Sequence, residues 1–210
     1  MKILSCLLLA TFLFSPLSFA EEIINTAAET KTQPLAEEKA AAVDRTLEAI
    51  EVLSGFSWAD LKDQDTLNQV PLIVDLDLNL KPLLQKINFY PEQLAQFQLE
   101  LFLAGISSPK ANFETGVNFF LKAGVFPQSW KFQPYVKAGL GLDYMTLHTK
   151  EQSTQFNFIE TGGAGAHYFF TENIAATVEY RFRHLSNSGI DHPNSGINSQ
   201  AVVGGVTFHF

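Results

Sequence analysis

From about residue 50 onward, apolar and polar residues alternate along the chain with a period of two. The clearest runs are VPLIVDLDLNLK, QFQLELFLAG, FETGVNFFLKAGV and YVKAGLGLDY. Successive side chains of a β-strand point to opposite faces, so each run predicts a strand with one apolar and one polar face. Seven such strands are predicted, at residues 69–80, 95–106, 112–125, 133–147, 155–170, 173–186 and 198–210.

The chemistry of the polar face separates two architectures that share this pattern. A soluble barrel or sandwich, such as a lipocalin-like lipid carrier, buries its apolar faces and exposes its charges. An outer-membrane barrel turns the apolar face to lipid and fills a narrow interior with polar side chains. The predicted polar face mixes both signs of charge with many glycines, which suits an interior network of ion pairs. Its charged members are Asp75, Asp77, Glu100, Glu114, Lys122, Lys137, Asp143, Glu179, Arg181 and Arg183.

Membrane barrels of bacteria have an even number of strands, so an eighth strand is predicted first in the order, in IEVLSGFSWAD at residues 50–60. The predicted fold is therefore all-β: an eight-stranded antiparallel transmembrane β-barrel of the outer membrane. Eight strands leave no open pore, which argues against a diffusion channel. The last strand ends on Phe210, and a terminal aromatic residue resembles the signal that the barrel-assembly machinery of the outer membrane recognises.

The amino-terminal region differs in composition from the barrel. Residues 1–20 combine Lys2, an apolar run and a Ser-Phe-Ala ending, the order of a cleaved signal peptide. Residues 21–48 are rich in Ala, Glu and Thr and predict a polar periplasmic leader without regular structure, followed by the barrel domain at 49–210. Cys6 is the only cysteine, so cleavage leaves no disulfide or thiolate metal site. A net charge of −8 argues against a nucleic-acid partner.

A histidine and a serine stand two positions apart in the stretch EYRFRHLSNSGIDHPNSGIN, residues 179–198. The even positions of strand 173–186 carry its apolar stripe, so His184 and Ser186 follow the face predicted to meet lipid. With both chain ends in the periplasm, this strand runs outward and places the pair at its outer end. The two residues stand about 7 Å apart at the backbone, so an imidazole and a hydroxyl can meet after side-chain rotation. Polar residues also occur wherever a strand leaves a membrane, and His-x-Ser alone is a weak motif.

The segment HLSNSGIDHPNSGIN resembles the His-x-Ser-Asn signature of the outer-membrane lipid A 3-O-deacylases, the PagL-type family, also called acyloxyacyl hydrolases. Members are eight-stranded barrels in which a lipid-facing Ser and His remove an ester-linked acyl chain from lipid A. The resemblance implies that Ser186 is the nucleophile and His184 the base that activates it. It also implies that Asn187 and the backbone of Gly189 stabilise the oxyanion.

The third member of the implied catalytic triad departs from the family pattern. The best-known members carry a Glu where this chain has Asn198. Asn198 shares the parity of the lipid-facing stripe, and an Asn can orient an imidazole, but it cannot stabilise the imidazolium by charge. The sequence leaves three alternatives open: the enzyme works with Asn198, an acid such as Asp191 or Glu160 substitutes, or activity is low.

The other polar residues show no pattern typical of a catalytic or metal site. His192 and Asp191 fit solvated turn positions, and His148, His167 and His209 lack the spacing of metal ligands, so neither a metal nor a cofactor is implied. The sequence thus predicts a serine esterase that hydrolyses lipid A or lipopolysaccharide in the outer leaflet. The alternative is a non-catalytic small outer-membrane barrel with a structural or adhesive role. Whether the barrel forms a homodimer is left open.

Overall fold

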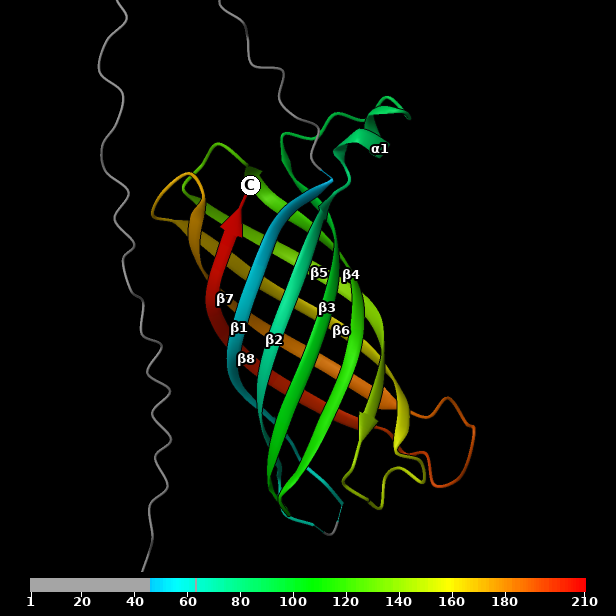
Figure 1. Cartoon of the computed structure of the whole chain (residues 1–210). Helices are drawn as coiled ribbons and strands as arrows, with labels where there is room; N and C mark the ends of the chain where they lie inside the picture. The colour runs from blue at the N-terminus through cyan, green and yellow to red at the C-terminus, as the bar shows by residue number, and fades with distance from the viewer. Residues whose placement is uncertain (1–45, 63) are drawn as a thin grey trace, which may run out of the picture. The chain divides into compact units, whose positions relative to one another are not determined.

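Eight antiparallel strands close into one barrel in the computed structural model, which describes residues 46–62 and 64–210. Each strand pairs with the next along the chain, and β8 pairs with β1 to complete the ring (Figure 1). The strands are β1 (Leu47–Ala59), β2 (Leu67–Asn79), β3 (Gln93–Ser108), β4 (Asn112–Pro127), β5 (Phe132–Met145), β6 (Phe156–Phe169), β7 (Ile174–Ser186) and β8 (Ile197–His209).

All eight predicted strands are confirmed, with boundaries that differ by three residues at most. The first strand, for which the pattern was weakest, begins at Leu47, two residues before the predicted start of the barrel domain at 49. A short helix, α1 (Lys81–Gln85), was not predicted; it lies in the β2–β3 connection, where Pro82 suits a first helical turn. The signal peptide and nearly all of the predicted leader lie outside the described residues.

The two faces of the strands have opposite environments, and the apolar one faces outward. Leu121 and Leu140, for example, are 64% and 65% exposed, whereas Asp75, Glu100 and Glu179 are almost completely buried. A water-soluble barrel would show the reverse, so the alternative of a soluble lipid carrier is wrong. Aliphatic and aromatic residues on the outside with charges inside are the arrangement of an outer-membrane barrel.

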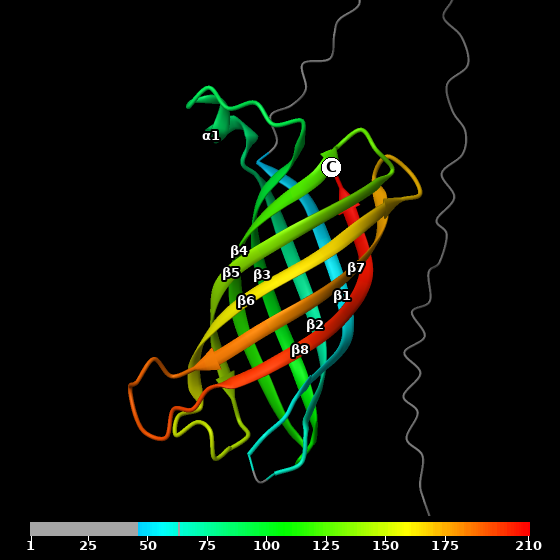
Figure 2. The same cartoon turned by 180° about the vertical axis from the view of Figure 1, so that it is seen from behind.

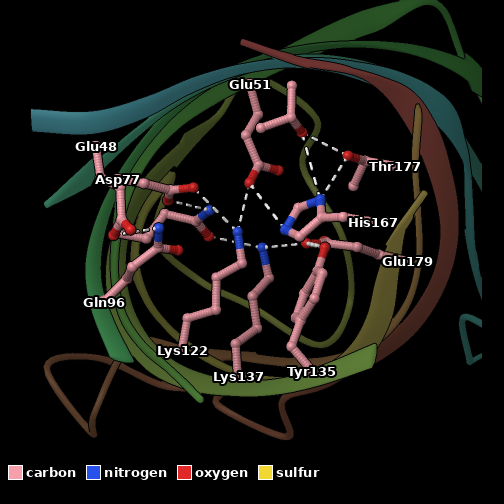
Figure 3. Close-up of polar contacts among 12 residues, drawn as sticks. Glu48, Glu51, Asp77, Gln96, Lys122, Tyr135, Lys137, His167, Thr177 and Glu179 are labelled. Atoms are coloured by element: carbon pink, nitrogen blue, oxygen red, sulfur yellow. Dashed lines mark hydrogen bonds and ion pairs between the residues drawn. The ribbon is translucent and has the colours of Figure 1, made fainter. Parts of the chain in front are cut away.

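The interior is filled by charged side chains, as predicted from the polar face, and each of the four predicted cations is paired with a carboxylate. Asp75 and Asp143 have no hydrogen-bond partner among the described residues. Lys122 contacts Glu51 and lies 3.0 Å from Asp77, and Lys137 lies 2.9 Å from Glu179 (Figure 3). Nearer the outer end, Arg181 pairs with Glu100 at 2.6 Å, and Arg183 pairs with Glu114. These side chains occupy the lumen, in keeping with the small diameter of an eight-stranded barrel.

The connections assign the two ends of the barrel. The C-terminus, the turns 128–131 and 170–173, and the β2–β3 connection share one end (Figures 1 and 2). The ten-residue segments 146–155 and 187–196 lie side by side at the other end (Figure 2). Both chain ends of such barrels lie in the periplasm, so the end that carries the C-terminus is the periplasmic one and the second end is the outer one. The 13-residue β2–β3 connection is an exception to the usual short periplasmic turns. Within the described residues, none of the helical structure has the length and apolar character needed to span a bilayer.

Candidate active site

The predicted pair occupies the outer end of β7 on its outward face. Along β7 the odd positions are turned into the barrel, and the last of them, Arg183 and Leu185, contact the lumen side. His184 and Ser186, at even positions, therefore continue the outward stripe of Val178 and the aromatic residues that follow it. The face predicted from parity is the face that the structure shows.

Asn198 holds the imidazole of His184 from the neighbouring strand. The two residues are directly opposite each other in the β7–β8 ladder, and His184 Nδ1 lies 2.7 Å from Asn198 Oδ1. An amide oxygen only accepts hydrogen bonds, so Nδ1–H is the donor and the lone pair remains on Nε2. This is the tautomer that a general base toward a serine requires, with the base nitrogen opposite the anchored one.

Gly196 provides the space into which the His184 ring fits. A Cβ atom at Gly196 would lie 2.4 Å from Cε1 and 3.0 Å from Nε2 of His184, well inside contact distance. The φ angle of Gly196 is +73°, a conformation that residues with side chains adopt at a cost. The ring of His184 is thus held by a hydrogen bond at Nδ1, and Gly196 leaves the space that the Cε1 side of the ring occupies.

Ser186 is the last residue of β7 and lies opposite Phe158 of β6. Among the described residues its hydroxyl has no hydrogen-bond partner, and no bond joins it to His184. The two side chains are related by the two-residue repeat of one strand face, about 7 Å at the backbone. Contacts between a nucleophile and its base are often long without substrate and shorten when substrate binds.

Asn187 is completely buried and organises the loop that follows Ser186. Its Nδ2 donates to Ser153 Oγ at 3.2 Å and to the carbonyl of Asp191 at 2.9 Å, and its Oδ1 accepts from Gly189 N–H at 2.9 Å. The two groups predicted to stabilise an oxyanion are therefore both engaged in bonds within the loop. Their oxyanion role stays a prediction, and the role that these contacts support is to shape the loop.

The loop 187–196 is also fastened to the neighbouring loop 146–155. Ser153 N–H donates to the carbonyl of Pro193 at 2.9 Å, and Ser195 N–H donates to that of Glu151 at 2.8 Å. Gln152 and Asn194 form a β-bridge between the two loops. These bonds connect segments far apart in the sequence and support the backbone on which Ser186 and Gly196 lie.

The two acids considered as substitutes for the missing Glu have different positions. The carboxylate of Asp191 accepts from the N–H of His192 at 2.8 Å, so it belongs to the loop's own turn. Glu160 lies on the outward face of β6, directly opposite His184 on the side away from Asn198. No ion pair joins Glu160 to His184 in the described part of the chain.

A surface cavity of about 380 Å³ adjoins this arrangement at the outer end of the barrel. It is bordered by Asn198 and Gly196, the two residues that contact the His184 ring. Trp58 and Phe182 contribute apolar walls, while loop residues including Glu151 contribute polar ones. An amphipathic molecule fits such a boundary between apolar and polar surfaces. The described residues contain no group of three or more His, Cys, Asp or Glu side chains able to hold a metal ion.

Two features of the site were not fixed by the sequence. Gly196 lies in a Gly/Asn/Ser-rich loop whose composition predicts a turn but not contact with an imidazole. Glu160 was named from the sequence as one of two candidate acids, but its position directly opposite His184 follows only from the β6–β7 register.

Comparison with solved structures finds similar folds. The crystal structure of the outer membrane enzyme PagL is similar with a TM-score of 0.57 and 14% sequence identity, over 77% of this chain and 99% of that one. Neisserial surface protein A (NspA) is similar with a TM-score of 0.53 and 14% identity, over 77% of this chain and 96% of that one. At these identities the likeness establishes the fold alone. Comparison with curated protein sequences finds no match.

The sequence model of the family described as lipid A 3-O-deacylase (PagL) matches residues 76–207. This range runs from β2 almost to the end of β8 and includes His184, Ser186 and Asn198. It covers well over half of the chain, and the barrel has the architecture of the outer membrane. The chain therefore belongs to the lipid A 3-O-deacylase (PagL) family.

Proposed function

We propose that this protein is an outer-membrane serine esterase that removes an ester-linked acyl chain from lipid A, with Ser186 as nucleophile and His184 as general base. The observation that carries the proposal is the hydrogen bond from His184 Nδ1 to Asn198, which leaves Nε2 as a base on the face that carries Ser186. The family match to lipid A 3-O-deacylases supports the choice of substrate.

The location of the pair restricts the substrate to molecules of the membrane. His184 and Ser186 lie outside the barrel wall, next to residues such as Phe182 whose side chains are exposed to lipid. A soluble ester would have to enter the bilayer boundary to reach Ser186. An acyl ester of lipid A lies at that boundary in the outer leaflet and can reach the site by lateral diffusion.

The proposed reaction follows the logic of an activated serine. Nε2 of His184 takes the proton of the Ser186 hydroxyl as the oxygen attacks the ester carbonyl. The imidazolium then returns the proton to the leaving alkoxide of the sugar, and an acyl-serine forms. A water molecule, deprotonated by the same nitrogen, attacks the acyl-serine. The imidazolium returns that proton to the Ser186 oxygen, the fatty acid leaves, and the enzyme is regenerated.

Oxyanion stabilisation in this scheme belongs to the turn after Ser186. Ser188 and Gly189 both have positive φ angles, 53° and 79°, so the backbone turns tightly directly behind the nucleophile. Successive backbone N–H groups in such a turn converge on a concave surface that binds anions. We assign oxyanion stabilisation to Asn187 and Gly189 as part of the proposal, with Gly189 N–H exchanging its bond to Asn187 for the developing oxyanion.

The test is the mass of lipid A extracted from cells that produce the wild type or the Ser186→Ala variant. The wild type is expected to yield lipid A that lacks one acyl chain, and Ser186→Ala is expected to leave lipid A intact. Ser107→Ala is a matched control, because Ser107 is an outward-facing serine at the outer end of β3. Lipid A that keeps all its acyl chains in the presence of folded wild-type protein would refute the enzymatic proposal.

A non-catalytic barrel is the second candidate, and one observation favours it: Asn198 brings no negative charge to His184. It predicts that His184→Ala and Ser186→Ala cells have the same lipid A as wild-type cells. Export by the signal peptide and recognition of Phe210 by the assembly machinery are further parts of the proposal. Loss of the barrel from outer-membrane fractions after deletion of residues 1–20 or of Phe210 tests them.

A further inference from the structure

Glu160 is an anomaly on the outside of the barrel. Among the strand residues that the structure describes, it is the only carboxylate on the outward face; the buried acids of the strands all point into the lumen. Its neighbours along the same face are Phe156 and Phe158 on the outer side, whose rings are in edge contact at 5.7 Å. A charged group facing lipid is costly and marks a functional position whose partner should be identified.

The strand register places that partner next to it. Glu160, His184 and Asn198 are successive cross-strand neighbours on β6, β7 and β8, with His184 in the middle. Directly opposed residues of antiparallel strands have Cβ atoms about 4.5–5.5 Å apart. The imidazole is therefore flanked by an amide on one side and by a carboxylate on the other.

The acid of a catalytic triad orients the imidazole and stabilises its positive charge. Around His184 these two roles belong to different residues. Asn198 holds Nδ1 and sets the tautomer, and Gly196 leaves space beside Cε1 of the ring. Neither carries a charge. On its own strand, the outward neighbours of His184 are Phe182 and Ser186, which are also uncharged. Glu160 is the carboxylate that the strand register places next to His184; Asp60 and Glu151 line the adjoining cavity but are not cross-strand neighbours of His184.

We propose that Glu160 is a positioning residue that supplies the negative charge for His184, while Asn198 supplies its orientation. The inference rests on the proposed function of Ser186 and His184. In the attack step the proton moves from the Ser186 oxygen to Nε2, the ring becomes an imidazolium, and the carboxylate of Glu160 stabilises this cation. Glu160 neither takes nor gives a proton, and the ring returns to neutral when the proton passes to the leaving oxygen.

The interaction does not require direct contact. A charge pair several ångströms apart retains substantial energy where lipid and aromatic side chains exclude water. Phe156 and Phe158 provide such surroundings on the outer side of Glu160. In this arrangement the proposed base receives a negative charge although its directly bonded partner is an uncharged Asn198.

The test compares Glu160→Gln, Asn198→Glu and the double variant on lipopolysaccharide in detergent micelles. Glu160→Gln is expected to lower kcat by roughly tenfold to a hundredfold and to change KM by less than about twofold. Asn198→Glu in the Glu160→Gln background is expected to restore most of the lost kcat, because the charge returns on the other side of the ring. Glu160→Asp, which keeps the charge, is expected to retain more activity than Glu160→Gln. Glu172→Gln, an exposed acid of the periplasmic turn, is the matched control.

Labelling of Ser186 by a probe tests the role of Glu160 independently of whether lipid A is the substrate. An alkyl fluorophosphonate reacts with an activated serine without lipid A, so the rate of Ser186 labelling reports on His184 directly. If the wild type is labelled but does not deacylate lipid A, the proposed substrate fails, and a slower labelling of Glu160→Gln still supports the role of Glu160. Unchanged labelling and kcat in Glu160→Gln, a change confined to KM, or no recovery in the double variant overturns it. A wild type that the probe does not label overturns both proposals.

Discussion

The barrel has two polar regions, the lumen and the outer end of β6–β8, and they differ in how their polar groups are bonded. In the lumen, Lys122 has two carboxylate partners, and Arg181 is bonded to Glu100 and Glu179. On the outside, His184 has one partner, and the hydroxyl of Ser186 has none among the described residues. In the lumen the Lys and Arg side chains are paired with carboxylates and fill space, although Asp75 and Asp143 have no hydrogen-bond partner among the described residues. The outer group instead leaves the proposed base and nucleophile available. The contrast favours a structural role for the first region and supports the proposed catalytic role of the second.

The largest effect should come from His184→Ala, which removes the proposed base. Deacylation is expected to fall by about a thousandfold or more, because the serine loses its proton acceptor. The midpoint of urea unfolding in lipid vesicles should stay within error of the wild type, since the ring lies outside the core. Kinetics on purified lipopolysaccharide and tryptophan fluorescence during unfolding measure the two quantities. A loss of folding equal to the loss of activity would contradict the separation of the two regions.

Lys122→Met should have the opposite pattern to His184→Ala. It should lower the free energy of unfolding strongly and leave the deacylation activity of the folded protein nearly unchanged. The substitution leaves Glu51 and Asp77 buried without their cation, and breaking a buried pair costs about 3–5 kcal/mol. Urea unfolding in vesicles checks the free energy. Lys110→Met, at an exposed loop position, serves as the control and should be neutral.

Gly196→Ala should lower activity by roughly tenfold to a hundredfold, because the new methyl group collides with the ring that Asn198 holds. Gly189→Ala is the matched comparison. Gly189 also has a positive φ, +79°, but a Cβ there would meet nothing within 4 Å. Both substitutions strain the backbone, and Gly189→Ala also disturbs the proposed oxyanion N–H, so a larger loss of kcat in Gly196→Ala than in Gly189→Ala reports the contact with His184 over and above these effects. A loss in Gly196→Ala no larger than that in Gly189→Ala would contradict the importance of this contact.

The smallest of these effects is expected from Asn187→Ala. The buried amide bonds to Ser153, Asp191 and Gly189, so its removal should loosen the loop behind the nucleophile. A loss of about 1–3 kcal/mol is the usual cost of buried polar groups left without partners, and it should appear as local hydrogen exchange in residues 187–196. Because Asn187 Nδ2 already donates to Ser153 and Asp191, its direct share in oxyanion stabilisation should be small, and we expect only a several-fold drop in kcat with the barrel intact. Unchanged exchange in the loop would contradict the structural role of Asn187.

The alternation of residue types was sufficient to predict the barrel, because a strand has a two-residue repeat and each face has one environment. The same parity placed His184, Ser186 and Asn198 on one face before their contacts were known. It was sufficient even for β1, where the pattern was weak, because a membrane barrel needs an even number of strands. The helix α1 was not predicted, because five residues are too few to show the 3.6-residue periodicity of a helix.

The sequence by itself therefore determined the fold, the inside and outside of the barrel, and the stripe that carries the candidate site. The tertiary structure decided which residues of neighbouring strands are opposite one another. Register depends on loop lengths and hydrogen bonds between strands, and these join residues as far apart as Glu160 and Asn198. Only that register shows that the Asn198 amide and the Glu160 carboxylate flank one imidazole, and that Gly196 leaves room for it. The alternation of side chains between the two faces is a local property of each strand. Which residues of adjacent strands lie opposite one another is decided only in the closed barrel.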